Sequence, residues 1–308
     1  MANIPLSDLR LMQGLAQKIT ARNPALLNGD STVGELAWVW GQTYDALNEF
    51  WNHRLWFVDD ELAAYGWAVL PYRVPRGDGT FRESKEANLR WQVDPDHPEL
   101  LNDVMTWYDD VAGDVDRLLI IQTADDAAQA FVPGHGYVHD PDDGDWIKFS
   151  SRDLTDVAEP VLPDGFQFLT ADEVSVAEIV KAHQAAWHPS SFTETAMERV
   201  QKTWPYRSDM HVFVQAPDGT LAGSAIVWLD EAMLTAEFEP VSTHPDYRRR
   251  GLGSALQLHG MQKARAAGAK LMLVACLGAP EHPSAQNMYH GVGFREITRD
   301  MTYMKVAP

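Results

Sequence analysis

The segment THPDYRRRGLGSAL, residues 243–256, decides the fold of this 308-residue chain. It joins a predicted strand, Leu234–Thr243, to a predicted helix that ends at Gly268. Glycines such as Gly251 and Gly253 let a backbone approach a ligand closely, and a loop before a helix presents unpaired N–H groups and the positive end of the helix dipole. With three flanking arginines, these features predict a cradle for a phosphate or pyrophosphate group. The alternative is a tight turn at a solvated, basic helix start.

Two common phosphate-binding loops do not fit this segment. A P-loop needs Gly-Lys followed by Ser or Thr, and the dinucleotide fingerprint needs a third glycine that GLGSAL lacks. Around the segment, apolar patterning predicts mixed α and β structure. A helix over ADEVSVAEIVKAHQAAW, with Thr170 and Glu173 as a capping box, and the hairpin HVFVQ–LAGSAIVWLD come before it. A buried strand KLMLVACL, a short helix around Ser284–His290 and a last strand MTYMKV follow it.

Three pieces of the second half occur together in one known superfamily. THPDYRRRGLGSAL is followed by LMLVACL and then by SAQNMYHGVGF, which carries a tyrosine ahead of a Gly-Phe turn. In this order and spacing they resemble the GNAT acetyltransferases, from about Phe166 to Val306. The resemblance implies acetyl-CoA as co-substrate, with its pyrophosphate on the loop and its pantetheine arm along the preceding strand. The cofactor-binding residues it implies are Val241, Ser242, Thr243, Arg248, Arg249, Arg250, Gly251, Leu252, Gly253, Ser254 and Ser284.

Acetyl transfer to an amine is helped by a general base, because an ammonium group has no lone pair to attack a thioester. The candidates are Glu237 and Glu239, which period-two alternation places on one face of the strand before the loop. Glu237 is slightly preferred, because its distance from the loop matches the carboxylate base of similar enzymes. Pro240 marks a bulge or a sheet edge, and a bulge would turn the next N–H groups toward the thioester. The alternative is that one glutamate merely pairs with an arginine.

Tyr289 matches the family tyrosine and is the candidate acid for the leaving thiolate. Its alternative role is packing, since buried tyrosines are common and need only a hydrogen-bond partner. Similar proteins often carry asparagine seven positions earlier, where this chain has His282, so Ser284 is expected to take over that contact. The candidate walls of an acceptor pocket are Trp187, His188, Phe192 and Trp228.

The first half repeats the order of the second half. A hairpin, a strand, an apolar strand and a Gly-containing turn follow one another, with Pro95 and Gly134 matching Pro245 and Gly291. Self-similarity on this scale predicts duplication of one α/β unit. The predicted fold class is α/β (α+β), with two tandem GNAT-like domains, each a mixed, mostly antiparallel twisted sheet flanked by helices. The predicted domains are residues 1–152 and 162–308.

The first domain lacks the residues that carry chemistry in the second. It has no basic glycine loop, and Ala87, Leu89 and Val132 replace the two glutamates and the tyrosine. His135 and His139 could suggest a metal pair, but the surrounding turn residues favour a solvated loop, and no metal is expected. The first domain is therefore predicted to be non-catalytic.

Composition bounds the partners of the chain. Its 25 basic and 44 acidic residues give a net charge of −19, which argues against nucleic acid and anionic membranes. Residues 1–150 hold 11 basic and 25 acidic residues, a net −14, and residues 151–308 hold 14 and 19, a net −5. The single cysteine, Cys276, excludes an internal disulfide and fits a reducing compartment. With no apolar run near the ~20 residues of a membrane helix and no signal-peptide pattern, a cytoplasmic protein is predicted.

The predicted activity is acetyl-CoA-dependent N-acetylation of the primary amine of a small molecule, by direct transfer in a ternary complex. Two alternatives stay open: acetylation of a protein or peptide amine, and an acyl-CoA-binding sensor without turnover. The expected partners are acetyl-CoA and a small amine acceptor, with the chain acting as a monomer or a homodimer.

Overall fold

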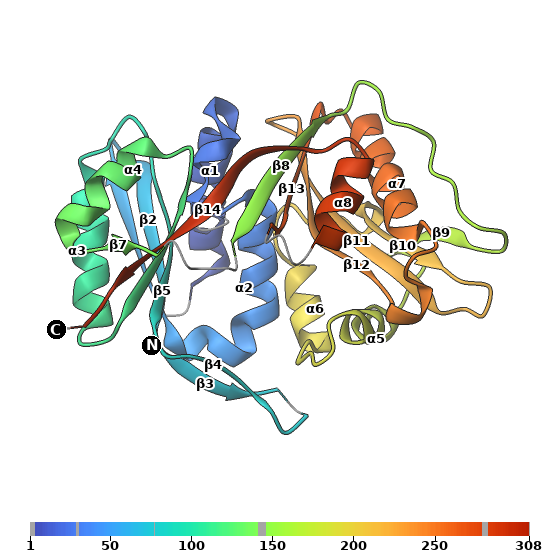
Figure 1. The fold of residues 1–308 in the computed structure, drawn as a ribbon, viewed down its shortest axis with the longest axis horizontal. Coiled ribbons are helices and arrows are strands. Elements are labelled where there is room, and N and C mark those ends of the chain that lie inside the picture. Colours follow the sequence, from blue (N-terminus) through green and yellow to red (C-terminus); the bar gives the residue numbers. More distant parts are fainter. Residues whose placement is uncertain (1–3, 29–30, 77, 141–145, 279–282, 308) are drawn as a thin grey trace. The chain divides into compact units, whose positions relative to one another are not determined.

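The computed structural model describes residues 4–28, 31–76, 78–140, 146–278 and 283–307. The chain divides into two compact units that are interleaved in sequence. Unit 1 comprises Met1–Leu36, Thr43–Lys148 and Ile297–Pro308. Unit 2 comprises Ala37–Gln42 and Phe149–Glu296. Each unit is built on a mixed, mostly antiparallel sheet with helices packed on it (Figure 1), as the sequence predicts.

The sheet of unit 1 is built from six strands of the described residues. They are β1 Trp51–Val58, β2 Glu61–Val69, β5 Ala87–Val93, β6 Arg117–Gln122, β7 Val138–His139 and β14 Arg295–Lys305. Their order is β1-β2-β5-β6-β14, with β7 beside β14. Only β5 and β6 run parallel, and the other pairs in this order are antiparallel. The remaining strands, β3 Tyr72–Pro75 and β4 Phe81–Ser84, form a separate hairpin.

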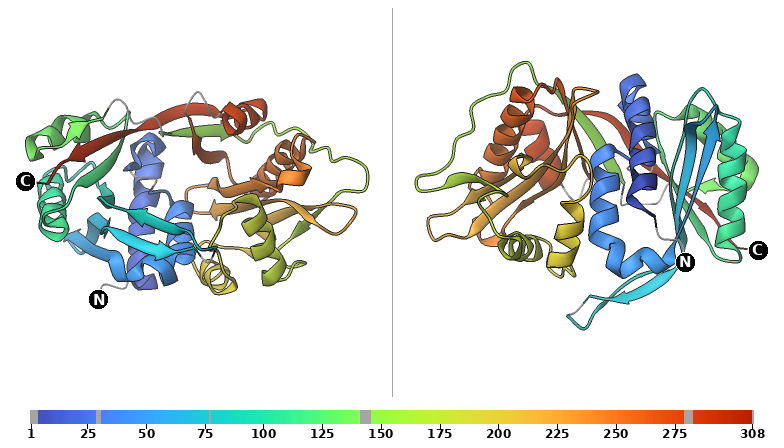
Figure 2. Two further views of the ribbon diagram at one scale, coloured as in Figure 1. Left: turned by 60° about the horizontal axis from the view of Figure 1, so that its bottom comes forward. Right: turned by 180° about the vertical axis from the view of Figure 1, so that it is seen from behind.

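Helices lie on both sides of this sheet. Helix α1 (Leu6–Arg22) and helix α3 (Leu100–Ala112) lie on opposite faces (Figure 2). Helix α3 is amphipathic, and its buried residues recur at three- and four-residue spacing, which directs one stripe toward the sheet. That stripe packs with Leu89 and Trp91 of β5 in the core of the unit. The other helices are α2 (Val33–Leu47) and α4 (Asp126–Phe131).

The sheet of unit 2 has the same arrangement around one parallel pair. Its strands are β8 Ile147–Asp153, β9 Gln167–Thr170, β10 His211–Gln215, β11 Leu221–Asp230, β12 Thr235–Thr243 and β13 Leu271–Leu277. Their order is β8-β13-β12-β11-β10-β9. The strands β9 to β12 pair antiparallel in sequence, and β12 and β13 run parallel.

Two pairs of helices cover the two faces of this sheet (Figure 1). Helices α7 (Leu252–Ala266) and α8 (Pro283–Gly291) pack on one face, and α5 (Val176–Ala186) and α6 (Glu194–Val200) on the other. Phe238 of β12 faces α7, where Gly260 makes room for its ring: a Cβ at Gly260 would lie 2.6 Å from Phe238. Trp228 of β11 faces the opposite core. Burying a ring such as Phe238 stabilises the fold by about 3 kcal/mol.

The strands that complete the two sheets are exchanged in sequence. Residues 300–305 of β14 pair with β6 in unit 1, whereas β8, from the end of the first half, lies beside β13 in unit 2. The sequence prediction kept the last strand in the second domain, with boundaries at residues 152 and 162. The compact units differ from it at Ile297–Pro308, at residues 149–152 and at Ala37–Gln42 of α2. The reason is physical: a strand pattern shows that a segment needs a neighbour, but not which sheet edge supplies it.

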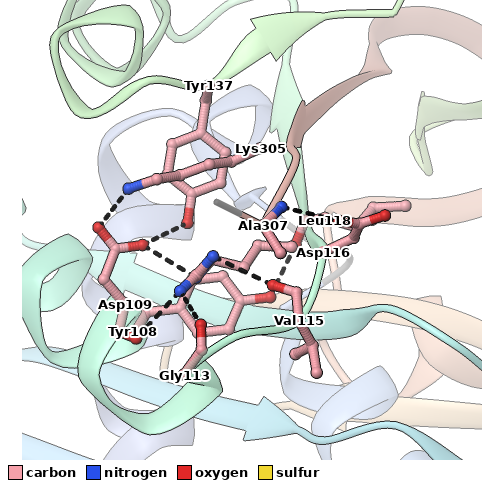
Figure 3. A network of polar contacts seen from close by, with 10 residues as sticks. Tyr108, Asp109, Gly113, Val115, Asp116, Leu118, Tyr137, Lys305 and Ala307 are labelled. Carbon is pink, nitrogen blue, oxygen red and sulfur yellow. Dashed lines mark hydrogen bonds and ion pairs between the residues drawn. The ribbon is translucent and has the colours of Figure 1, made fainter.

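A partly buried polar network holds β14 in unit 1 (Figure 3). Its centre is Asp109 on α3, whose carboxylate is 3.1 Å from Arg117 Nε and 2.7 Å from Lys305 Nζ. The Arg117 side chain is 6% exposed and also donates to the carbonyl of Val115 at 3.0 Å. Tyr137 donates its hydroxyl hydrogen to Asp109 at 3.4 Å. Because Arg117 comes from β6 and Lys305 from β14, one carboxylate ties the exchanged strand to its neighbour and to α3.

None of the described helices is both long and apolar enough to cross a membrane.

Candidate active site

The two parallel strands of unit 2 separate before β12 ends. Their described pairing stops at Phe238↔Val274, and the rest of β12, Glu239–Thr243, continues beside β11. A cavity of about 660 Å³ lies against the edge of β12 that β13 has left. It is closed by the loop before α7, by the first turns of α7 and α8, and by the end of α5. Its volume falls within the range of small-molecule and cofactor sites. We call it the unit 2 cavity.

A bulge lies at the proline in β12, where the sequence predicts either a bulge or a sheet edge. The register of β11 and β12 shifts between Ala225 and Val227, so that Glu239 and Pro240 stand opposite Ile226 alone. Proline has no N–H to give to the ladder, which makes this position suited to an irregular pairing.

Beyond the bulge, the backbone of β12 faces the unit 2 cavity with alternate N–H groups. His244 donates its N–H to the carbonyl of Ala222 on β11 at 3.0 Å. In an antiparallel strand, neighbouring residues direct their N–H groups to opposite sides. The N–H groups of Val241 and Thr243 therefore point away from β11, toward the edge on which the cavity lies.

The loop after β12 ends in an uncapped helix start. Gly251 is the N-cap of α7, with φ 78° and ψ 0°, and no side chain caps the first turn. The first helical hydrogen bond runs from Ala255 N to Gly251 O at 3.0 Å. Arg249 also has a positive φ of 64°. At Gly253, a Cβ would lie 2.5 Å from Met288 Sδ, so a glycine lets α7 begin close to α8.

The unit 2 cavity brings together ten of the eleven residues predicted to bind acetyl-CoA. The exception is Arg250, whose guanidinium lies 5.2 Å from the centre of the Tyr247 ring. Arg248 reaches back to the carbonyl of Thr243 at 3.3 Å and to that of Ala186 at 3.4 Å. The ten are Val241, Ser242, Thr243, Arg248, Arg249, Gly251, Leu252, Gly253, Ser254 and Ser284.

The cavity wall also holds residues that the sequence analysis did not assign to it. Tyr247, next to the three arginines, donates its hydroxyl hydrogen to Asp218 at 2.6 Å. Adjacency to the loop was the signal that could have marked it. Asn287 and Met288 lie one turn along α8, and no motif singles them out. His282 lies outside the described residues.

Of the four aromatic walls predicted for an acceptor pocket, one reaches the unit 2 cavity. Trp187 lines it, is 39% exposed and stacks on His183 with 4.6 Å between ring centres. Phe192 and Trp228 are 4% and 1% exposed and belong to the core between the sheet and helices α5 and α6. His188 is exposed and does not line the cavity. Large aromatic residues in this part of the sequence therefore mark the hydrophobic core more often than the wall of the cavity.

The two glutamates lie at different positions along β12: Glu237 in the part that pairs with β13, and Glu239 at the bulge. Glu237 is 7% exposed and stands opposite Trp228 in the ladder, on the sheet face away from Phe238. Glu239 lies at the bulge, where its carbonyl accepts a hydrogen bond from Trp228 Nε1 at 2.5 Å. Neither glutamate is among the residues that line the unit 2 cavity, whose first β12 residue is Val241.

Tyr289 lies on α8, belongs to the core between the sheet and helices α7 and α8, and is not among the residues that line the unit 2 cavity. Its side chain is 6% exposed, and its ring meets Phe294 edge to face at 5.7 Å. Burial raises the pKa of the Tyr289 hydroxyl well above its usual range, and the negative charge of Glu239 raises it further. The tyrosine therefore keeps its proton at neutral pH, and Glu239 is close enough for its charge to be felt there.

A buried histidine lies behind the strand edge. His211 contacts the Tyr206 hydroxyl at 3.2 Å and the Ser224 hydroxyl at 3.1 Å, and Ser224 stands opposite Ser242, which lines the cavity. Burial, and in second place the nearby His183, lower the pKa of His211 to about 3. At neutral pH the His211 ring is therefore uncharged.

In unit 1, the residues at the matching positions are part of the core. Ala87, Leu89 and Val132 are 0%, 3% and 0% exposed and pack in one apolar cluster. That cluster has no carboxylate or tyrosine at these three positions.

Comparison with known protein families gives a match within unit 2. Residues 177–294 match the sequence model of the acetyltransferase (GNAT) family. A search of curated protein sequences gives no significant match.

Solved structures match over nearly the whole chain. The GCN5-related N-acetyltransferase from Sphaerobacter thermophilus has a TM-score of 0.60 at 15% identity, over 99% of this chain and 94% of that one. A tandem GNAT protein from the clavulanic acid biosynthesis pathway has a TM-score of 0.59 at 14% identity, over 96% of this chain and 94% of that one. At such identities these matches establish the fold. Residues 177–294 thus match the GNAT acetyltransferase family, and the chain has the fold of the tandem GNAT proteins.

Proposed function

We propose that unit 2 acetylates the primary amine of a small molecule by direct transfer from acetyl-CoA in a ternary complex. GNAT acetyltransferases use acetyl-CoA as their co-substrate, so acetyl transfer itself follows from the family. The observation that carries the rest is the unit 2 cavity, where a basic helix start and a strand edge meet. Two glutamates and a tyrosine lie on the elements that border it.

The residues of the cavity fit a pyrophosphate group. A Cβ at Gly251 would meet no atom within 4 Å, so the helix start is open to a ligand. Uncapped N–H groups at the start of a 15-residue helix favour an anion, and Arg248 and Arg249 add two positive charges. The N–H groups of Val241 and Thr243 suit the amide-bearing arm of coenzyme A. Acetyl-CoA supplies the activated acetyl group as a thioester.

Glu237 or Glu239 would take the proton from the amine, directly or through a water molecule. The ammonium form must lose this proton before its nitrogen can attack. Glu237 is the more buried of the two, and Glu239 lies within electrostatic reach of Tyr289. The N–H of Val241 would donate a hydrogen bond to the acetyl oxygen, on which negative charge develops.

Tyr289 would hold the proton that the leaving sulfur needs. Burial raises the pKa of its hydroxyl, so the group is protonated over the whole neutral range. A general acid must carry its proton at the start of the reaction, and the Tyr289 hydroxyl meets that condition.

Release of free thiol from acetyl-CoA over a broad panel of small amines tests this function, with the acetylated product identified by mass spectrometry. We expect turnover with a subset of primary amines and none with their N-methylated tertiary analogues. Glu237→Gln and Glu239→Gln, measured separately, should lower kcat by about 100-fold for the base and much less for the other. Turnover on peptides alone would replace the small-molecule acceptor. Tight acetyl-CoA binding without product from any amine would overturn catalysis in favour of a sensor.

Unit 1 takes no part in the chemistry in this proposal. Its counterparts of the three catalytic positions, Ala87, Leu89 and Val132, are buried and apolar. We propose that the chain acts on its acceptor as a monomer or as a homodimer, with each chain carrying one acetyl transfer site.

A further inference from the structure

One aromatic side chain of the unit 2 cavity has no role in the proposed chemistry. Trp187 follows the last residue of helix α5, lines the cavity and is 39% exposed. An indole that is exposed in a cavity is available to a ligand, whereas a tryptophan of the core is not. The rings behind Trp187, its place along the cavity and the charges beside it indicate which part of a ligand it contacts.

The inner side of the Trp187 indole is held by packed aromatic rings. It stacks on His183, with 4.6 Å between the ring centres and 25° between the ring planes. His183 lies in turn 4.3 Å from Phe192 and 5.7 Å from Trp38, which are each 4% exposed. Burial lowers the pKa of His183 to about 4, so its ring is uncharged at neutral pH. One face of the indole is therefore fixed against the core, and the exposed area is left for a ligand.

Trp187 lies toward the phosphate end of the cavity. The carbonyl of its neighbour Ala186 accepts a hydrogen bond from the Arg248 guanidinium at 3.4 Å. The same guanidinium donates to the carbonyl of Thr243, the last residue of β12, at 3.3 Å. In the proposed function the acetyl group lies toward the bulge at Glu239, at the other end of this stretch of β12. The end of α5 is thus tied to the loop that would hold the pyrophosphate.

The charges beside Trp187 argue against the amine acceptor as its ligand. Arg248 and Arg249 line the same cavity, and no aspartate or glutamate within the described part of the chain lines it. Two positive charges repel an ammonium group and attract a phosphorylated ligand. Adenine is the only aromatic ring of acetyl-CoA, and one ribose joins it to the pyrophosphate. Bases stack readily on aromatic side chains, so an indole beside the pyrophosphate loop suits this ring.

We propose that Trp187 stacks on the adenine ring of acetyl-CoA and so holds the nucleotide end of the cofactor in the unit 2 cavity. This role rests on the proposed function only in that acetyl-CoA binds in the cavity, and it does not depend on turnover or on the identity of the acceptor. It moves Trp187 from the wall of an acceptor pocket, where the sequence predicts it, to the cofactor site.

Three ligands separate the parts of the cofactor. Acetyl-CoA carries all of them, S-acetyl-4′-phosphopantetheine lacks the adenosine, and adenosine 3′,5′-bisphosphate lacks the pantetheine arm. Each is titrated into the full-length protein by calorimetry and by tryptophan fluorescence, with the Trp187 signal taken as the difference between the wild-type protein and Trp187→Phe. We expect acetyl-CoA and the bisphosphate to quench the Trp187 signal, because adenine stacks on the indole, and the phosphopantetheine to leave it unchanged.

Variants at this one position grade the aromatic ring. Trp187→Leu keeps an apolar side chain without a ring and should weaken binding of acetyl-CoA and of the bisphosphate by about 10-fold. Trp187→Phe keeps a smaller ring and should weaken both by about 3-fold. Neither variant should change the affinity for S-acetyl-4′-phosphopantetheine. Trp146→Phe, at a partly buried tryptophan of unit 1, is the matched control and should bind all three ligands as the wild-type protein does.

The other outcomes distinguish this inference from the proposed function. Equal weakening of acetyl-CoA and S-acetyl-4′-phosphopantetheine by Trp187→Leu would place the indole on the pantetheine arm and overturn the stacking. An unchanged affinity for acetyl-CoA with a raised KM for the amine would return Trp187 to an acceptor pocket. Acetyl-CoA binding that Trp187→Leu weakens, without turnover of any amine, would overturn catalysis and leave the stacking intact. No binding of acetyl-CoA by the wild-type protein would overturn both.

Discussion

In each unit a cavity lies beyond the end of the parallel strand pair, but the two cavities have different linings. The cavity of unit 2 is lined by Arg248, Arg249 and the start of α7 at Gly251, whereas that of unit 1 is lined by Asp94, Asp125 and Asp126. The backbone cause of both cavities is shared. Two parallel strands pair for a few residues and then separate, so each sheet leaves a hollow at the ends of its strands. The residues that follow the strands decide what the hollow accepts. The separation of the parallel strands therefore determines where each cavity lies, and the residues that follow the strands determine the charge of its wall.

The sharpest test of this contrast compares two glycines with the same backbone. Gly251 has φ 78° and ψ 0°, and Gly136 of unit 1 has φ 84° and ψ 13°. A valine in either place meets a similar left-handed strain of about 1–2 kcal/mol. Only Gly251→Val fills the helix start, so it should weaken acetyl-CoA binding by about 1000-fold, or about 4 kcal/mol, through the loss of two charge-assisted hydrogen bonds. Calorimetric titration checks this, and equal affinities in the two variants would remove the pyrophosphate site from the α7 start.

The second comparison concerns buried charge. Ala87 pairs with Arg117 in the parallel ladder of unit 1, whereas Glu237 pairs with Leu273 in that of unit 2. Asp109→Ala removes the carboxylate that Arg117 and Lys305 share, and should lower the free energy of unfolding by about 3 kcal/mol, because it leaves a buried guanidinium uncompensated. Urea denaturation followed by circular dichroism measures the loss. Asp110→Ala, exposed on the same helix, should change stability by less than about 0.5 kcal/mol.

A third comparison sets a tyrosine of unit 2 against one of unit 1. Tyr289→Phe keeps the ring that packs on Phe294 and removes the hydroxyl, so kcat should fall by about 100-fold while the affinity for acetyl-CoA stays nearly constant. Tyr303→Phe in β14 removes a hydroxyl from a residue of unit 1 that is 7% exposed, against 6% for Tyr289, and should leave kcat unchanged. Steady-state kinetics and a separate binding titration distinguish the two effects. An unchanged kcat in Tyr289→Phe would end its role as the acid.

The last comparison concerns acid stability. His211 of unit 2 is the one histidine that is buried among the described residues, and burial holds its pKa near 3, against about 6.5 in an unfolded chain. Below pH 6.5 the unfolded chain binds a proton that the folded chain does not. Stability is thus full above pH 6.5 and is lost as the pH falls toward 3, by up to about 1.4 kcal/mol per pH unit. Unfolding free energies measured from pH 7 to pH 4 should show a shallower slope in His211→Asn. The exposed His188→Asn should keep the native slope, and identical slopes in both variants would contradict the assignment.

Short sequence patterns were enough to predict much of the secondary structure of unit 2. The hairpin, the parallel strand, the short helix near residue 284 and the bulge at Pro240 all follow from patterns within about ten residues. The glycine loop was also readable, because glycine spacing and arginine charge are properties of one short segment. Ten predicted residues meet in one cavity, since they are carried by one strand end, one loop and one helix start.

Two features show where local rules fail. The pattern Ser/Thr-x-x-Glu occurs twice between residues 170 and 178, at Thr170 and at Ser175, and each pair forms hydrogen bonds. Only the second begins helix α5, so the capping box predicted at Thr170 was wrong, because a turn can satisfy the same contacts. The exchange of β8 and β14 was also missed, because strand pairing depends on segments more than 100 residues away.

The exchanged strand sets an order of events during synthesis. β6 is made at residue 122, but its neighbour β14 emerges only at residues 295–305, after all of unit 2 has been translated. Until then the β6 edge carries unpaired backbone groups that could recruit another nascent chain. The first half is therefore not a domain that can finish folding on the ribosome ahead of the second. Because of this one strand, unit 1 completes its sheet only after unit 2 has been synthesised.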